Sequence, residues 1–183
     1  MTSSGLCVLA TGPEIAKLLS LVESKRSISD ASAEPGKPSS VLFCSPCKVV
    51  AAGYFDAEKK GVHVCENHLG NSKKAITRTL THELVHAYDD MFGVLNDKPP
   101  LDWSSCKSRA CSEVRAAALS GDCDYTAEVA RGNFSPFNYY NRCVKRRAQL
   151  SISMQKACAD SAKCDVEEVF EQCLADRRPW TDN

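Results

Sequence analysis

The stretch Thr81-His82-Glu83-Leu84-Val85-His86 lies in the middle of a long helical pattern and decides the expected fold. Apolar residues recur at spacings of three or four between residues 72 and 92, as an amphipathic helix requires. Asn71 or Ser72 can cap the start of this helix, and Gly93 stands where a left-handed residue would end it. We therefore expect one long helix that carries both histidines.

Two histidines four residues apart project from a helix about 40° apart and about 6 Å along its axis. His82 and His86 can therefore bind one metal ion, whereas Glu83 points to the side, where a base rather than a ligand is expected. Zinc held by three protein ligands keeps a fourth position for water, whose pKa falls to about 7. The motif therefore predicts zinc-dependent hydrolysis of a peptide bond, with Glu83 accepting the proton of the attacking water.

Three acidic residues are candidates for the third zinc ligand: Asp89 and Asp90 on the same helix, and Glu113 on the next predicted helix. Asp90 shares the histidine face, but eight residues of helix place it about 12 Å beyond His82. Small residues beside Glu113 would allow the two helices to approach closely. Geometry therefore favours Glu113 as the ligand, with an ion pair to a neighbouring arginine as its alternative. Asp89 or Asp90 would then orient an imidazole.

The whole pattern predicts an α+β protein that is mainly helical, with the arrangement of a zincin: an active-site helix, a second helix carrying a glutamate ligand, and a small β element. Residues 1–40 are expected to be a flexible segment with a short helix over 13–23, and residues 41–183 a single zinc metalloprotease domain. A hairpin or two short strands are predicted over 49–55 and 61–65. Further helices are predicted over residues 102–119, 138–151 and 165–173, the first of them with Asp102 as a possible cap.

Charge and hydropathy narrow the classes of partner. Basic and acidic residues balance at 23 each, so any binding to nucleic acid or to an anionic membrane must be local. No stretch approaches the roughly 18 apolar residues of a membrane-spanning helix. The basic run between Arg142 and Arg147 has no accompanying aromatic stacking motif, so we interpret it as a solvated helix face and expect no nucleic-acid partner.

Eleven cysteines in 183 residues are many for a reduced enzyme. Disulfides in an oxidising compartment are one explanation, and they would leave Cys7 as the natural unpaired thiol. A structural zinc is another, because Cys44, Cys47, Cys65 and His68 have a spacing close to that of a zinc ribbon. Inert buried thiols are the third. The seven cysteines beyond this pattern favour disulfides.

A series of ordered motifs, covering about residues 44–180, extends the signal well beyond the two histidines. The motifs are Thr81–Asp90, Leu101-Asp102-Trp103, Ala110–Ala116, Leu119–Cys123, Cys143–Ala148 and Glu168–Cys173. Together they resemble the family of mitochondrial inner-membrane metalloproteases that process the precursor of ATP synthase subunit 6, peptidase family M76, whose animal relatives are called Ku-binding protein.

The resemblance implies a zinc metalloendopeptidase of the mitochondrial intermembrane space, peripheral to the inner membrane. Its protein substrate would be the subunit 6 precursor, and it would also assist assembly of that subunit into the membrane sector. His82, His86 and Glu83 match the family motif directly, and Glu113 matches a family position. Import with oxidation into that space would also explain the cysteines. The alternative from another class is a noncatalytic assembly factor or binding module with a structural zinc.

Overall fold

A computed structural model describes residues 12–29, 41–70, 72–95 and 99–181. The chain forms two compact units, the first ending at Met91 and the second beginning at Phe92. Among the residues described, no helix has both the length and the apolar character needed to cross a membrane.

The first unit contains a three-stranded sheet in the order β1-β3-β2. The central strand β3 (Gly61–Cys65) runs parallel to β1 (Leu42–Ser45) and antiparallel to β2 (Gly53–Asp56). The hairpin of β2 and β3 confirms the two short strands predicted for this region. Strand β1 was not predicted, because its parallel pairing with β3 joins residues twenty positions apart, such as Leu42 and Val62, and no turn signal marks that connection.

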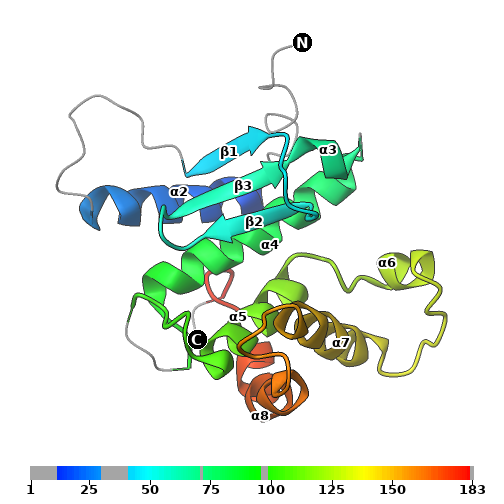
Figure 1. Ribbon diagram of the computed structural model, residues 1–183. Helices are drawn as coiled ribbons and strands as arrows, with labels where there is room; N and C mark the ends of the chain where they lie inside the picture. The colour runs from blue at the N-terminus through cyan, green and yellow to red at the C-terminus, as the bar shows by residue number, and fades with distance from the viewer. Residues whose placement is uncertain (1–11, 30–40, 71, 96–98, 182–183) are drawn as a thin grey trace. The chain divides into compact units, whose positions relative to one another are not determined.

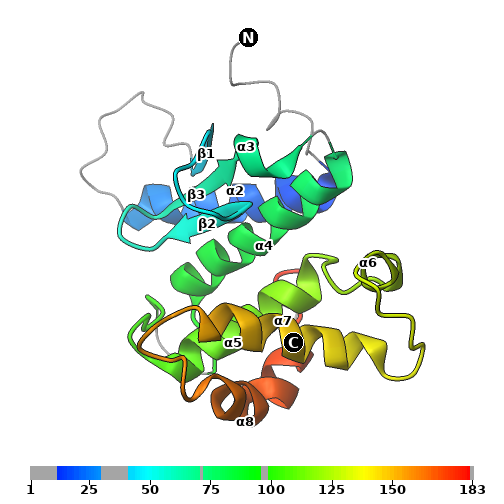
Figure 2. The ribbon, with the colours of Figure 1, turned by 45° about the vertical axis from the view of Figure 1, so that its right-hand side comes forward.

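Three helices accompany this sheet: α2 (Pro13–Ser29), α3 (Glu66–Leu69) and α4 (Lys73–Phe92). Helices α2 and α4 lie on the same side of the sheet (Figures 1 and 2). The first helix was predicted to end at Glu23 and to precede the packed domain. The structure extends it and buries three apolar side chains from one of its faces, so α2 belongs to the core of this unit. Those side chains are Ile15, Leu18 and Val22.

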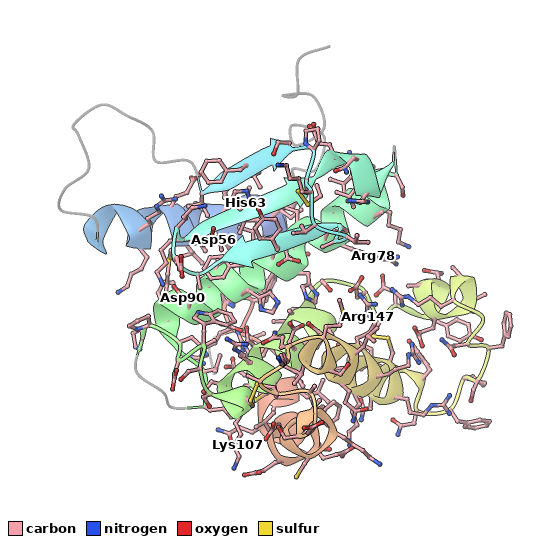
Figure 3. The ribbon with its side chains drawn as sticks, in the orientation of Figure 1. Asp56, His63, Arg78, Asp90, Lys107 and Arg147 are labelled. Atoms are coloured by element: carbon pink, nitrogen blue, oxygen red, sulfur yellow. A yellow bond between two sulfur atoms is a disulfide. The ribbon has the colours of Figure 1, made fainter. Side chains whose placement is uncertain are left out.

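The outward side of the sheet carries a row of three stacked rings. His63 on β3 lies between Phe43 on β1 and Tyr54 on β2, with ring centroids 5.0 and 4.7 Å away. Figure 3 labels His63 on the central strand. This stacking gives His63 a structural role, as expected for an isolated histidine in a strand.

Helix α4 confirms the long helix predicted around the two histidines. The hydroxyl of Ser72 accepts a hydrogen bond from the Ala75 amide at 3.3 Å, so Ser72 caps the first turn as predicted. Gly93 follows the last residue with a φ of 78°, a backbone conformation that glycine adopts without strain. Both ends of the helix are therefore fixed by residues that the sequence identifies.

The second unit is helical, and its core forms where α5 packs against both α7 and α8. Its helices are α5 (Cys106–Leu119), α6 (Tyr125–Ala130), α7 (Tyr139–Ser153) and α8 (Ala162–Ala175). The three longer helices were predicted, whereas α6 is too short to show a period. Asp102 does not cap α5, because its carboxylate accepts hydrogen bonds from Ser104. The cap is Ser105, whose hydroxyl accepts from the Ser108 amide at 3.3 Å.

Disulfides account for most of the cysteines in the described residues, as the composition indicated. Cys47 bonds to Cys65 in the first unit, which excludes a zinc ribbon because these two sulfurs bind each other. Cys44 is also disulfide-bonded. The free cysteine in this part of the chain is the exposed Cys164, and Cys7 lies outside the described residues. The second unit has three disulfides: Cys106–Cys158, Cys111–Cys173 and Cys123–Cys143.

Ion pairs occupy most of the basic run that the sequence places on α7. Three of its four side chains contact carboxylates, so they join elements of the second unit instead of only facing solvent. Glu128 on α6 is the most buried partner, with its side chain 2% exposed. The contacts join Arg146 and Arg131 to Glu128, Arg147 to Asp122, and Lys145 to Glu167.

We expect the second unit to lose stability in acid through Glu128 and Asp176. Burial alone would raise the pKa of each carboxyl, but hydrogen bonds and charges from nearby arginines outweigh it and hold both pKa values below their ordinary range. The ionised carboxylates therefore stabilise the fold above about pH 4, and this contribution disappears as the pH falls further. Urea unfolding monitored from pH 7 downward measures the effect. Glu128→Gln should be less stable at neutral pH but should show a shallower decline, and an unchanged slope would contradict the assignment.

Candidate metal centre

The two histidines of the motif lie side by side on one face of α4. The ring centroids of His82 and His86 are 4.9 Å apart, and the ring planes meet at 81°. His86 is 7% exposed, and His82 is partly buried. The helix therefore places two imidazoles within reach of a single metal ion, as four-residue spacing predicts.

Glu83 is buried beside this pair, at a point where a glycine of the neighbouring strand leaves it room. Glu83 is 8% exposed. A Cβ atom on Gly53 of β2 would lie 3.2 Å from Glu83 Cγ and 2.8 Å from Thr79 Cγ2. The absence of a side chain at Gly53 therefore lets β2 pass close to the catalytic candidate. Gly53 was not predicted to matter for the site, because no local pattern in a single sequence relates it to Glu83, thirty residues later.

Replacing Gly53 by alanine is expected to reduce peptidase activity by up to about 100-fold, because the new methyl group would displace Glu83 or move the strand away. The variant should also be less stable by about 1–3 kcal/mol, since the methyl group would also lie 2.9 Å from the carbonyl oxygen of His63. Peptide cleavage rates and urea unfolding measure the two effects. Gly12→Ala is the control, because a Cβ at Gly12 meets no atom within 4 Å. Equal activity in both variants would contradict this packing argument.

The two aspartates that follow the motif have different surroundings. Asp90, labelled in Figure 3, binds the ammonium group of Lys60 through both carboxylate oxygens, at 2.8 and 3.0 Å. Its side chain is only 1% exposed, so this ion pair ties α4 to the turn before β3. Asp89 is fully buried. Lys60 was not predicted to bind Asp90, because the two residues are thirty positions apart in the sequence.

Glu113 lies on α5, is 8% exposed and contacts helix α7 of its own unit. The hydroxyl of Ser151 on α7 donates a short hydrogen bond to Oε1 of Glu113. The two arginines considered as alternative partners have contacts of their own: Arg109 donates to Gln155, and Arg115 forms an ion pair with Asp176. Glu113 is therefore a buried carboxylate that Ser151 orients. Ser151 was not anticipated from the sequence.

Ligand atoms of His82, His86 and Glu113 lie within 4.8 Å of one another. A search of the described residues for three or more His, Cys, Asp or Glu side chains with the spacing of a metal site finds this group. Two imidazole nitrogens and one carboxylate oxygen form a donor set that suits zinc and leaves a coordination position open. The three ligands favoured from the sequence thus fit a metal ion.

Comparison with known proteins identifies the family of the chain. A model of the Peptidase M76 family matches residues 9–181. The chain belongs to this family. The match confirms the resemblance that the ordered sequence motifs indicated, and it extends over both compact units. No solved structure matches the chain.

Three of the similar proteins are named mitochondrial inner membrane proteases or homologs of them. The chain is similar to the mitochondrial inner membrane protease atp23 of Schizosaccharomyces pombe, with 37% identity over 142 residues, which cover 76% of this chain and 72% of the relative. The Yarrowia lipolytica protease ATP23 is 39% identical over 142 residues, 76% of this chain and 54% of the relative. The human ATP23 homolog is 37% identical over 139 residues, 75% of this chain and 54% of the relative. The chain thus spans about half the length of the last two.

Proposed function

We propose that this M76 peptidase is a zinc-dependent endopeptidase with a zincin-like catalytic arrangement, and that residues 41–183 form its metalloprotease domain together with α2, which packs in the core of the first unit. The observation that carries the proposal is the group of two histidines and one glutamate with the spacing of a metal site. Membership of a peptidase family supports a hydrolytic role for this group.

In this proposal His82, His86 and Glu113 hold the zinc ion, and nearby side chains keep them in position. Ser151 fixes one carboxylate oxygen of Glu113 through its hydroxyl group. Asp89, fully buried one turn after His86, is proposed to orient an imidazole. Asp90 is less suited to that task, because both of its carboxylate oxygens already bind Lys60.

Glu83 is the proposed general base. When bound, zinc supplies a Lewis acid that acidifies water and polarises the carbonyl group of a peptide bond. Glu83 would take the proton of the attacking water and deliver it to the nitrogen of the leaving amine. Its burial and the close approach of Gly53 limit the space around the Glu83 side chain. Such positioning supports proton transfer, which requires contact within hydrogen-bond distance.

We further propose that the enzyme works in the mitochondrial intermembrane space, peripheral to the inner membrane. Two observations support this location: the relatives are named mitochondrial inner membrane proteases, and the described cysteines are mostly paired, as in an oxidising compartment. The proposed substrate is the precursor of ATP synthase subunit 6, together with a role in assembling that subunit into the membrane sector.

Zinc content and cleavage of the proposed precursor test this function together. The purified wild type should hold one zinc ion per chain, lose cleavage on chelation and regain it when zinc is restored. His82→Ala should lose both zinc and cleavage. His68→Ala is the matched control, because His68 is an exposed histidine outside the site, and it should keep both. Zinc retained in His82→Ala would contradict the proposal, and bound zinc without cleavage in the wild type would favour a noncatalytic assembly factor.

A further inference from the structure

The segment between α6 and α7 exposes two large aromatic side chains. We call residues 131–138 the aromatic loop; it contains Phe134 and Phe137, which are 67% and 81% exposed. Residues 125–140 hold five of the 13 aromatic residues in the chain. Figures 1 and 2 show this loop projecting at the margin of the helical unit, beyond the ends of α6 and α7. Exposed aromatic residues in such density usually mark a binding surface.

Hydrogen bonds to α6 hold the aromatic loop in place. The amide of Asn133 donates to the Glu128 carbonyl at 2.9 Å, and the hydroxyl of Tyr125 donates to the Phe134 carbonyl at 3.3 Å. The disulfide Cys123–Cys143 closes the segment at its base. The backbone that carries the two phenylalanines is therefore fixed by contacts of its own, and their outward position is a feature of the fold.

The surroundings of the loop are basic. No Asp or Glu occurs from residue 129 to residue 159, a stretch that contains six Lys or Arg residues. The carboxylate nearest the loop in sequence is Glu128, which binds Arg146 and Arg131. Arg142, in the first turn of α7, is exposed and forms no ion pair within the described residues. Apolar rings are thus flanked by positive charge.

We propose that the aromatic loop docks this protein on an anionic lipid bilayer, with Phe134 and Phe137 inserted at the interface and Arg142 on the head groups. This rests on the membrane location included in the proposed function. Aromatic side chains favour the membrane interface, and each nearby cation adds attraction to anionic lipid. A bilayer is a better partner for this protruding loop than a groove on another protein, because both rings can enter the lipid without a surface of complementary shape.

Sedimentation with vesicles tests the aromatic part of the surface. The full chain should bind vesicles of phosphatidylcholine mixed with phosphatidylglycerol. The double variant Phe134→Ser/Phe137→Ser should have a partition coefficient at least about tenfold lower than wild type, because two apolar rings no longer leave water on binding. Val50→Ser is the control, because Val50 is 90% exposed in the other unit and should not matter. An unchanged partition coefficient for the double variant would overturn the proposal.

Charge reversal tests the basic part of the surface. Arg142→Glu should bind the mixed vesicles about tenfold more weakly, and its difference from wild type should shrink at high salt. Lys163→Glu is the matched control on an exposed position of α8. Equal losses in the two variants would overturn the assignment, because only the total charge would then matter.

A fluorescent reporter and an activity assay separate this proposal from the proposed function. A tryptophan introduced by Phe137→Trp should shift its emission to the blue on mixed vesicles, and an unshifted spectrum would contradict insertion. Cleavage of a soluble peptide should be the same for the loop variants and wild type. Loss of vesicle binding with intact cleavage supports docking, whereas vesicle binding by a protein without peptidase activity would contradict only the catalytic proposal.

Discussion

Glu83→Gln is expected to keep its zinc while losing about 10³-fold or more of its peptidase activity. General base catalysis contributes roughly 10²–10⁴ to such reactions, and an amide cannot accept the proton of the attacking water. Glutamine has nearly the same size as glutamate, so the buried space beside Gly53 that Glu83 occupies should accommodate it. The loss should appear in kcat, because the substituted group acts in the transition state.

The matched control for this prediction is Glu58→Gln, which changes an exposed glutamate of the same unit. It should have the zinc content and the kcat of wild type. Mass spectrometry under native conditions measures the metal, and cleavage of a peptide with a defined scissile bond measures the rate. An active Glu83→Gln enzyme would show that Glu83 is not the base. Loss of zinc in this variant would instead make Glu83 a ligand.

Arg115→Met is expected to destabilise the protein by about 3–5 kcal/mol, the effect of removing one member of a buried ion pair. The Arg115 side chain is 0% exposed, and its guanidinium lies 2.6 Å from an oxygen of the Asp176 carboxylate. It also donates to the backbone carbonyls of Asp176 and Arg178, at 2.7 and 2.8 Å. The variant leaves these acceptors without their donor, and the segment after α8 loses its attachment to α5.

Lys107→Met provides the comparison for Arg115→Met, because Lys107 also contacts a carboxylate at 2.6 Å, that of Glu168. Both of these side chains are more than half exposed, so their ion pair should contribute less than about 1 kcal/mol. Urea unfolding of the two variants measures the difference. A similar loss for both would show that burial does not determine the strength of these pairs.

Local patterns were sufficient to predict the longer helices of this protein. Helix α4 has a clear period, a serine cap and a terminal glycine, all within twenty-odd consecutive residues. Strand β1 escaped prediction because no turn links it directly to its partner β3, and helices α3 and α6 because each is too short to show a period. The first residue of α5 was misplaced because Asp102 and Ser105 are both good capping residues, and only the structure shows which amide each one meets.

The candidate site divides in the same way. His82, Glu83 and His86 are related by the geometry of one helix, so their arrangement followed from the sequence. Two contacts of the acidic candidates, Ser151 with Glu113 and Lys60 with Asp90, join residues that are 38 and 30 positions apart. Contacts over such separations depend on how helices and strands pack, which a single sequence does not encode in any local pattern. For the same reason the disulfide connectivity could not be predicted.

Anomalous X-ray diffraction at the zinc edge, on crystals of the zinc-loaded protein, tests the central claim most directly. The account predicts one zinc ion bound by an imidazole nitrogen of His82, one of His86 and a carboxylate oxygen of Glu113, each at about 2.0–2.2 Å. Zinc bound elsewhere, or bound by the two histidines with the Glu113 carboxylate turned away from it, would contradict the account.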